Sequence, residues 1–307
     1  MLRYVIVIRL LFLLPIIMSK TISAAPTGYP DVPHFGYQTH YQAVWNLFDG
    51  QIDEILWQET GEPEDAKSKE VFIVQQDGKN WFVKIVPIDF DDPPLNHFEY
   101  EWELKTQLAD KNPLAAVGGE ITFADRGAFY TNSMQQCYVA RYPLVPGKTI
   151  RALADHYMRT KDFKDFDILT AAVYRYAQVS AYLHFDPDDP PKEGEDILER
   201  PVRFFLDDRN SRNEIYDYAT DTVYLIDYPP FHSHYNMSIP VKNYLLKSFG
   251  AALGGIIDDG RNLHLLYKTF ILGYVLALPK YDSLDLRDTL YRYIDRLAEA
   301  QKERRGN

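Results

Sequence analysis

The sequence predicts an α+β protein of two lobes, in which a small β-rich lobe precedes a larger helical lobe. Runs of residues with the character of strands gather before residue 145, whereas long segments with helical spacing dominate after residue 149. The composition, 46% hydrophobic and 25% charged over 307 residues, is that of an ordinary globular protein. We therefore expect the first lobe at residues 55–145 and the second lobe at residues 146–307.

The strand signals of the first lobe centre on a hairpin. Apolar runs at residues 71–74 and 81–86 flank the dipeptide Asp77-Gly78, which favours the tight turn of a β-hairpin. Two further strands are expected near residues 120–123 and 136–142. These segments together predict a small antiparallel sheet.

Apolar residues at helical spacing occur on both sides of the strand signals. In the first part of the chain they appear over residues 41–57 and 95–108. The sequence Pro-Leu-Val-Pro-Gly at residues 143–147 then breaks the strand pattern. Beyond it, residues 168–183 are strongly periodic and residues 241–302 are predominantly helical in character. The second lobe is therefore expected to consist mainly of helices.

The first 25 residues have the pattern of an export signal. Arg3 and Arg9 make the start basic, residues 10–18 are apolar, and residues 23–25 are small enough for a signal peptidase to cut there. The apolar run is shorter than the roughly 20 residues that span a bilayer. We therefore expect residues 1–25 to be a cleaved signal peptide and the protein to be secreted or to reside in a secretory lumen or periplasm. An uncleaved membrane anchor is the alternative.

Residues 26–54 are expected to form an extension that precedes the first lobe. After signal cleavage we expect no integral membrane span. The one later apolar stretch of note, residues 270–278, is short and bracketed by Lys268 and Lys280, which is typical of a buried helix.

Charge and cysteine content exclude two classes of protein. Acidic residues outnumber basic residues by 44 to 33, for a net charge of −11, which argues against a nucleic-acid partner bound through its phosphates. The single cysteine, Cys137, excludes an intramolecular disulfide. The fold must therefore be stabilised by its hydrophobic core.

Two charged residues suggest an ion pair in the first lobe. Lys84 stands in the middle of the predicted strand 81–86, and Glu101 lies on the helix predicted to follow, where Glu103 is an alternative partner. A Lys–Glu pair across a strand-to-helix step holds the amine where it can meet the phosphates of a nucleotide. Solvent-facing positions for both side chains remain the simpler interpretation.

A second polar cluster lies in the helical lobe, between two predicted strands at residues 202–206 and 222–226. Asp208 precedes Asn213 by five positions, and Asp227 ends the second strand. A loop carboxylate can accept a hydroxyl proton, while an amide and another carboxylate supply oxygen ligands for Mg²⁺. Phosphoryl transfer needs that set, although Asp and Asn are also common turn residues.

The order and approximate spacing of several features resemble the protein kinase-like fold superfamily, both the protein kinases and the aminoglycoside/choline kinase branch. These features are Lys84, Glu101, residues 143–147, Asp208, Asn213 and Asp227. The resemblance spans roughly residues 55–300. It implies a two-lobed fold with ATP and Mg²⁺ bound between a β-rich and a helical lobe.

The resemblance also implies a role for each residue. Lys84 would contact the phosphates of ATP and Glu101 would orient it, so both are expected nucleotide-binding residues. Asp208 would be the catalytic base, and Asn213 and Asp227 would be the metal ligands. We expect an exported, atypical phosphotransferase that moves the γ-phosphate of ATP to a hydroxyl of a protein or small-molecule acceptor.

Two alternatives share this fold. No G-x-G-x-x-G run precedes residue 71, and an acidic segment at residues 59–69 stands there instead. The chain is therefore also compatible with an inactive pseudokinase that acts as a secreted binding module. A kinase-fold nucleotidyltransferase is the other alternative.

The export signal makes a direct prediction. The exported protein should begin near Ala25 or Pro26, because the small residues 23–25 offer the cleavage site. N-terminal sequencing of the exported protein measures this. An intact Met1 recovered in a membrane fraction would show an anchor instead.

Overall fold

The computed structural model describes residues 33–59, 70–87, 114–133, 135–185, 195–196, 198–202, 213–226, 240–242, 260–277, 288–289, 291–292 and 295–296. The chain divides between Val32 and Pro33, and every described residue belongs to the compact unit that begins at Pro33. Strands dominate this unit up to Pro143, and its longer helices follow Thr149. The predicted α+β class, β-rich first and helical second, is confirmed.

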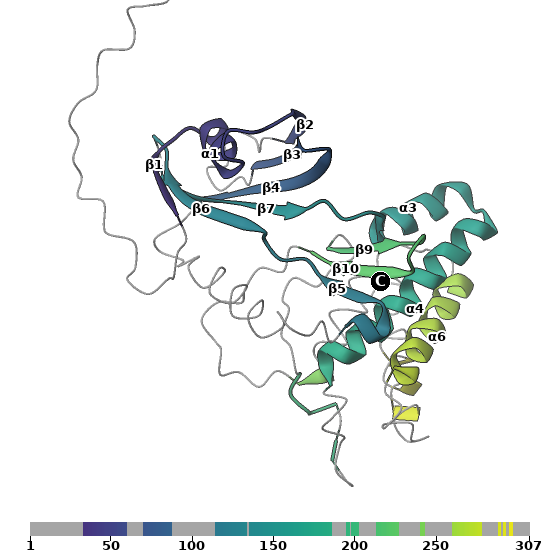
Figure 1. The fold of residues 1–307 in the computed structure, drawn as a ribbon. Coiled ribbons are helices and arrows are strands. Elements are labelled where there is room, and N and C mark those ends of the chain that lie inside the picture. The colour runs from purple at the N-terminus through teal and green to yellow at the C-terminus, as the bar shows by residue number, and fades with distance from the viewer. Residues whose placement is uncertain are drawn as a thin grey trace, which may run out of the picture. The chain divides into compact units, whose positions relative to one another are not determined.

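The first sheet has six strands in the order β1-β6-β7-β4-β3-β2 (Figure 1). Their bounds are β1 His34–Tyr37, β2 Glu54–Glu59, β3 Glu70–Gln76, β4 Lys79–Pro87, β6 Arg126–Thr131 and β7 Gln136–Pro143. Strand β1 runs parallel to β6, and the other neighbours are antiparallel. The pairing of β4 with both β3 and β7 puts the strand of Lys84 in the interior of the sheet.

The hairpin expected around Asp77-Gly78 is confirmed as β3 and β4. Asp77 and Gly78 have φ angles of 52° and 70°, the left-handed values that a tight two-residue hairpin requires. Gln76 pairs with Lys79 directly across this turn. Because the turn sets the register, every later pair of the hairpin follows from it.

Helix α1, His40–Leu47, packs on the first sheet. Thr39 caps it through a reciprocal bond with Gln42, so the start of the helix is satisfied locally. Its buried side chains join one hydrophobic cluster with those of the sheet: Ala43, Val44, Leu47, Phe48, Phe72, Val74, Val83, Ile85, Ala128, Tyr130, Cys137 and Val139. Residues of the predicted N-terminal extension thus belong to the core of the first sheet.

The helix predicted over residues 41–57 is wrong beyond Leu47. Asp49 and Gly50 have φ angles of 54° and 75°, which end the helix, and strand β2 begins at Glu54. The apolar residues Ile55 and Leu56 therefore belong to a strand. The helix expected over residues 95–108 lies outside the described residues.

The second sheet has four strands in the order β5-β10-β9-β8. They are β5 Gly119–Ile121, β8 Lys148–Thr149, β9 Glu214–Asp217 and β10 Thr222–Leu225. Strand β10 pairs antiparallel with β9 and parallel with β5. Strand β5 falls inside the range predicted for the first lobe, yet its partner stands about one hundred positions later in the chain, so no local pattern could reveal the pairing.

A second hydrophobic cluster surrounds three helices: α3 Ile150–Thr160, α4 Phe163–His184 and α6 Gly260–Leu276. The predicted periodic segment 168–183 lies within α4, and α6 falls in the predicted helical region 241–302. Two separate clusters, one per sheet, agree with the expected two lobes. The exact lobe boundaries at residues 55, 145 and 146 stay predictions.

Helices α4 and α6 pack closely through a buried polar contact and a glycine. The His184 Nδ1 atom lies 2.7 Å from the Tyr274 hydroxyl in the interior. A Cβ at Gly273 would stand 2.5 Å from the carbonyl oxygen of Tyr174, which only glycine avoids. The second cluster therefore has a fixed register between its two main helices.

Candidate functional site

Lys84 lies in the middle of β4, as the sequence predicts. Its neighbours Val83 and Ile85 are buried in the cluster beneath α1, with 0% and 1% of their surface exposed. Since side chains alternate along a strand, Lys84 projects from the opposite face of the sheet. There it is half-buried.

The sheet face around Lys84 is apolar and aromatic. Lys84 pairs in register with Val71 on β3 and Ala140 on β7. One step along the same face, Phe82 pairs with Tyr142, and their rings lie 6.3 Å apart in a tilted arrangement. An ammonium on a half-buried apolar face attracts an anion more strongly than one in open water, because the surroundings screen it less.

Asn213 directly precedes strand β9 and is 9% exposed. Its carbonyl oxygen accepts a hydrogen bond of 2.9 Å from the backbone N–H of Ile226, which follows β10. Between them Glu214 pairs in register with Leu225. The β9–β10 hairpin thus joins the backbone at Asn213 to the residue that immediately precedes Asp227 in the sequence.

The turn at the other end of this hairpin is anchored to α4. Arg175 forms an ion pair with Asp221 and donates to Gln178 and to the Val117 carbonyl at 2.8 and 3.3 Å. The Tyr216 hydroxyl donates to Asp221 at 2.9 Å. Burial acts to raise the pKa of Asp221, but the hydrogen bonds from Arg175 and Tyr216 hold that pKa below its ordinary value. The carboxylate therefore stays charged and keeps the hairpin turn in place.

The break predicted at residues 143–147 connects the two sheets along the chain. Strand β7 ends at Pro143, and β8 begins at Lys148 and pairs with Tyr216 of β9. Gly147 has a φ of 106°, and an added Cβ would lie 2.3 Å from the Tyr216 carbonyl oxygen. Only glycine allows the connection to pass this close to the strand that follows Asn213.

The structure places two of the five predicted site residues, Lys84 and Asn213. Glu101, Asp208 and Asp227 lie outside the described residues, as does Glu103. The roles of all five stay predictions. Among the described parts of the chain, no group of three or more His, Cys, Asp or Glu side chains is arranged to hold a metal ion.

One charged residue at this site was not anticipated. Glu214, next to Asn213, is fully buried. In the sequence it follows a run of polar residues, 207–213, and nothing local distinguishes it from a solvent-facing turn residue. Its burial follows from the pairing of β9 between β10 and β8, which is a tertiary property.

Comparison with known proteins leaves the family open. No protein-family model matches the chain, and no curated protein matches it. Among solved structures, WaaP in complex with acyl carrier protein is similar over 86% of this chain and 93% of that chain, with 15% sequence identity and a TM-score of 0.43. Such an identity bears on fold alone, and this TM-score is too low to argue from. The α+β class rests instead on the elements described above.

The helices of the described residues include none that is both long and apolar enough to cross a membrane. Helix α6, which contains most of the apolar stretch 270–278, is part of the second cluster through Phe270, Ile271, Tyr274 and Val275. The expectation of a helix at this stretch is confirmed for residues 270–276, and its burial is confirmed for one face only, because Leu272 and Leu276 are exposed.

Gly147 provides a test of how tightly the connection passes β9. Gly147→Ala should lower the free energy of unfolding by about 2–4 kcal/mol, because the methyl group meets the Tyr216 backbone and the positive φ is strained. In the matched control, Gly78→Ala, φ is also positive, at 70°, but nothing lies within 4 Å of the new Cβ. The control should cost about 1 kcal/mol. Urea unfolding measures both, and equal losses would mean that the contact with Tyr216 is not tight.

Proposed function

We propose that the protein is a kinase-like phosphotransferase that moves the γ-phosphate of ATP to a hydroxyl of a protein or small-molecule acceptor. The observation that carries this proposal is the hydrogen bond between Ile226 and Asn213. It closes a short hairpin between residue 213, one of the two positions predicted to bind the metal, and residue 226, which precedes the other in the sequence. Residues 213 and 227 are fourteen positions apart in the sequence, and the hairpin brings the backbone of residue 226 next to that of residue 213.

Lys84 is the proposed phosphate ligand in the first sheet. Its ammonium projects from an apolar face that offers flat aromatic surface at Phe82 and Tyr142. A nucleotide suits such a face, because the base can pack on apolar groups while the phosphates meet the amine. In this proposal Glu101 pairs with Lys84 and orients it.

Asn213 and Asp227 are the proposed ligands of Mg²⁺. An amide oxygen and a carboxylate are hard oxygen donors, which is the ligand chemistry that Mg²⁺ prefers when phosphates complete its coordination. The hairpin pairing of Glu214 with Leu225 supports the assignment, because it keeps both ends of the β9–β10 ribbon in register. When bound, the ion neutralises charge on the phosphates.

Asp208 is the proposed catalytic base. The acceptor hydroxyl oxygen attacks the γ-phosphorus, the bond from that phosphorus to the bridging oxygen breaks, and ADP leaves with the bonding electrons. The proton of the hydroxyl passes to the Asp208 carboxylate. Orientation of the hydroxyl by this carboxylate is the main contribution, since catalysis of phosphoryl transfer rests on positioning and charge stabilisation.

Export is part of the same proposal. The signal-like residues 1–25 would deliver the enzyme to a secretory lumen, a periplasm or the cell exterior. The acceptor would then be a hydroxyl on a protein or small molecule of that compartment. The net charge of −11 disfavours a polyanionic acceptor such as a nucleic acid.

Thermal stabilisation by Mg²⁺ and ATP tests nucleotide binding. At 100 times the Kd, ATP should stabilise the purified protein by about 2.7 kcal/mol. Lys84→Ala should lose this stabilisation, whereas Lys79→Ala, which changes an exposed lysine at the start of the same strand, should keep it. Asp227→Ala should lose the Mg²⁺-dependent part. A wild-type protein indifferent to nucleotide would favour the inactive binding module.

Turnover tests the proposed base. Asp208→Asn should lower kcat by about 10²–10⁴-fold, the usual contribution of a positioned base, with the KM for ATP nearly unchanged. Asp207→Asn is the control, because it changes the neighbouring carboxylate and should be much milder. A steady-state assay of phosphate transfer measures both. If Asp207→Asn abolishes turnover and Asp208→Asn does not, the base is assigned one residue too late.

A further inference from the structure

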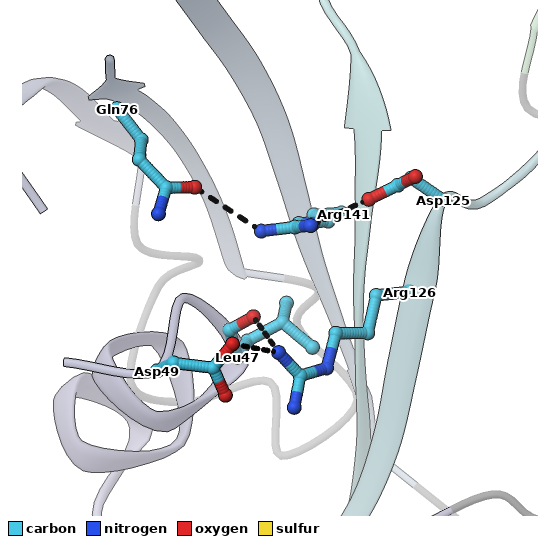
Figure 2. Close-up of polar contacts among 6 residues, drawn as sticks. All are labelled: Leu47, Asp49, Gln76, Asp125, Arg126 and Arg141. Atoms are coloured by element: carbon cyan, nitrogen blue, oxygen red, sulfur yellow. Dashed lines mark hydrogen bonds and ion pairs between the residues drawn. The ribbon is translucent and has the colours of Figure 1, made fainter. Parts of the chain in front are cut away.

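Arg141 on β7 connects several elements of the first sheet at one point (Figure 2). Its Nε and Nη2 atoms both lie 2.7 Å from Oδ2 of Asp125, in the segment before β6, and Nη1 donates to Gln76 of β3 at 3.3 Å. The backbone N–H of Asp125 also donates to the Arg141 carbonyl at 2.8 Å. Only 16% of the Arg141 side chain is exposed.

The guanidinium of Arg141 also lies over two aromatic rings. It stands 5.0 Å from the ring centre of Phe48, the residue that directly follows α1 and caps its end, and 4.6 Å from that of Trp81 on β4. The two rings contact each other edge to face. A planar cation packed on both rings joins the end of α1 to strand β4.

A second arginine holds the same end of the helix. Arg126 on β6 donates to the Leu47 carbonyl at 3.3 Å and to Asp49 at 2.6 Å, as Figure 2 shows. Arg126 and Arg141 are direct partners across β6 and β7, so their like charges stand opposite each other. Asp49 and Asp125 each neutralise one of them. The sheet and the helix end are therefore coupled by charge as well as by packing.

The register places this cluster directly behind Lys84. Arg141 pairs with Val83, the residue before Lys84 on β4, and both side chains lie on the α1 face of the sheet. Trp81, Val83 and Ile85 take alternate positions on β4 and face α1, whereas Lys84 faces away. The packing of α1 on these residues therefore helps to fix the position of the strand from which Lys84 projects.

We propose that Arg141 is a positioning residue for Lys84, acting through β4 from the opposite face of the sheet. The consequence for nucleotide binding rests on the proposed function. Loss of the guanidinium removes the ion pair with Asp125 and the packing of the cation on the rings of Phe48 and Trp81, so β4 is held less firmly against α1. The Lys84 amine then samples more positions and meets the phosphates less often.

The reactivity of the Lys84 amine tests this without any nucleotide. The full chain is acetylated briefly under native conditions, and labelling of each lysine is followed by peptide mass spectrometry. Arg141→Met should raise the labelling rate of Lys84 about threefold or more, the scale of coupling between packed residues. Lys164, an exposed lysine of α4 that has no part in the Arg141 contacts, is the internal reference and should not change.

Three further variants separate positioning from general loss of stability. Val173→Ala makes a cavity in α4, in the other hydrophobic cluster, and should destabilise the protein without changing Lys84 labelling. Arg151→Met removes an exposed arginine–aspartate pair of α3 and should change neither. Arg141→Lys keeps a charge for Asp125 but not the planar group that packs on both rings, so its effect should be intermediate. It also replaces Arg141→Met should the latter fail to fold.

Calorimetry of Mg²⁺–ATP binding supplies the second measurement. Arg141→Met should weaken the Kd about 3–10-fold relative to wild type, with Val173→Ala unchanged. Unchanged Lys84 labelling in Arg141→Met, or an equal rise in Val173→Ala, overturns the inference. A third outcome is that Arg141→Met selectively raises the labelling of Lys84 while the wild-type protein binds no nucleotide. This outcome overturns the proposed function, but it leaves the positioning of Lys84 by Arg141 standing.

Discussion

The two faces of strand β4 are the constraint on which the first sheet depends. Val83 and Ile85 are buried against α1, and the alternation of a strand then sends Lys84 to the other face. A slip of one residue in the β3–β4 hairpin would bury the ammonium of Lys84 among the apolar side chains beneath α1. Burial of a charge among apolar groups costs free energy. The turn at Asp77 and Gly78 prevents this slip by setting the register.

The β9–β10 hairpin has the corresponding role in the second sheet. Its turn is held by Asp221 and Arg175, and its open end is closed by the bond from Ile226 to Asn213. Strand β7, the neighbour of β4, continues along the chain into β8, and β8 pairs with β9. The first sheet is therefore linked through β8 to the hairpin that follows Asn213. Gly147 makes that connection possible by its left-handed backbone.

The sequence predicted the strand of Lys84, because that strand depends on a local pattern. It placed Asn213 in a loop between strands at residues 202–206 and 222–226 and missed strand β9, which begins at Glu214. It failed where the pattern was ambiguous. Apolar residues over 41–57 fit helical spacing, but Asp49 and Gly50 adopt left-handed backbone and divide the segment into α1 and β2. It also missed β6, whose mixture of arginine, glycine and aromatic residues has no clear period. The roles assigned to Glu101, Asp208 and Asp227 stay predictions.

By itself the sequence determined the fold class, the β3–β4 turn, the long helix α4 and the face on which Lys84 stands relative to Val83. These follow from periods of two and 3.6 residues and from turn chemistry, which act between near neighbours in the chain. Only the tertiary structure decided that β5 pairs with β10, that α1 packs on the first sheet, and that Arg141 packs on both Phe48 and Trp81. A sequence period says that a residue has a buried face, but the partner on that face is chosen by packing among segments far apart in the chain.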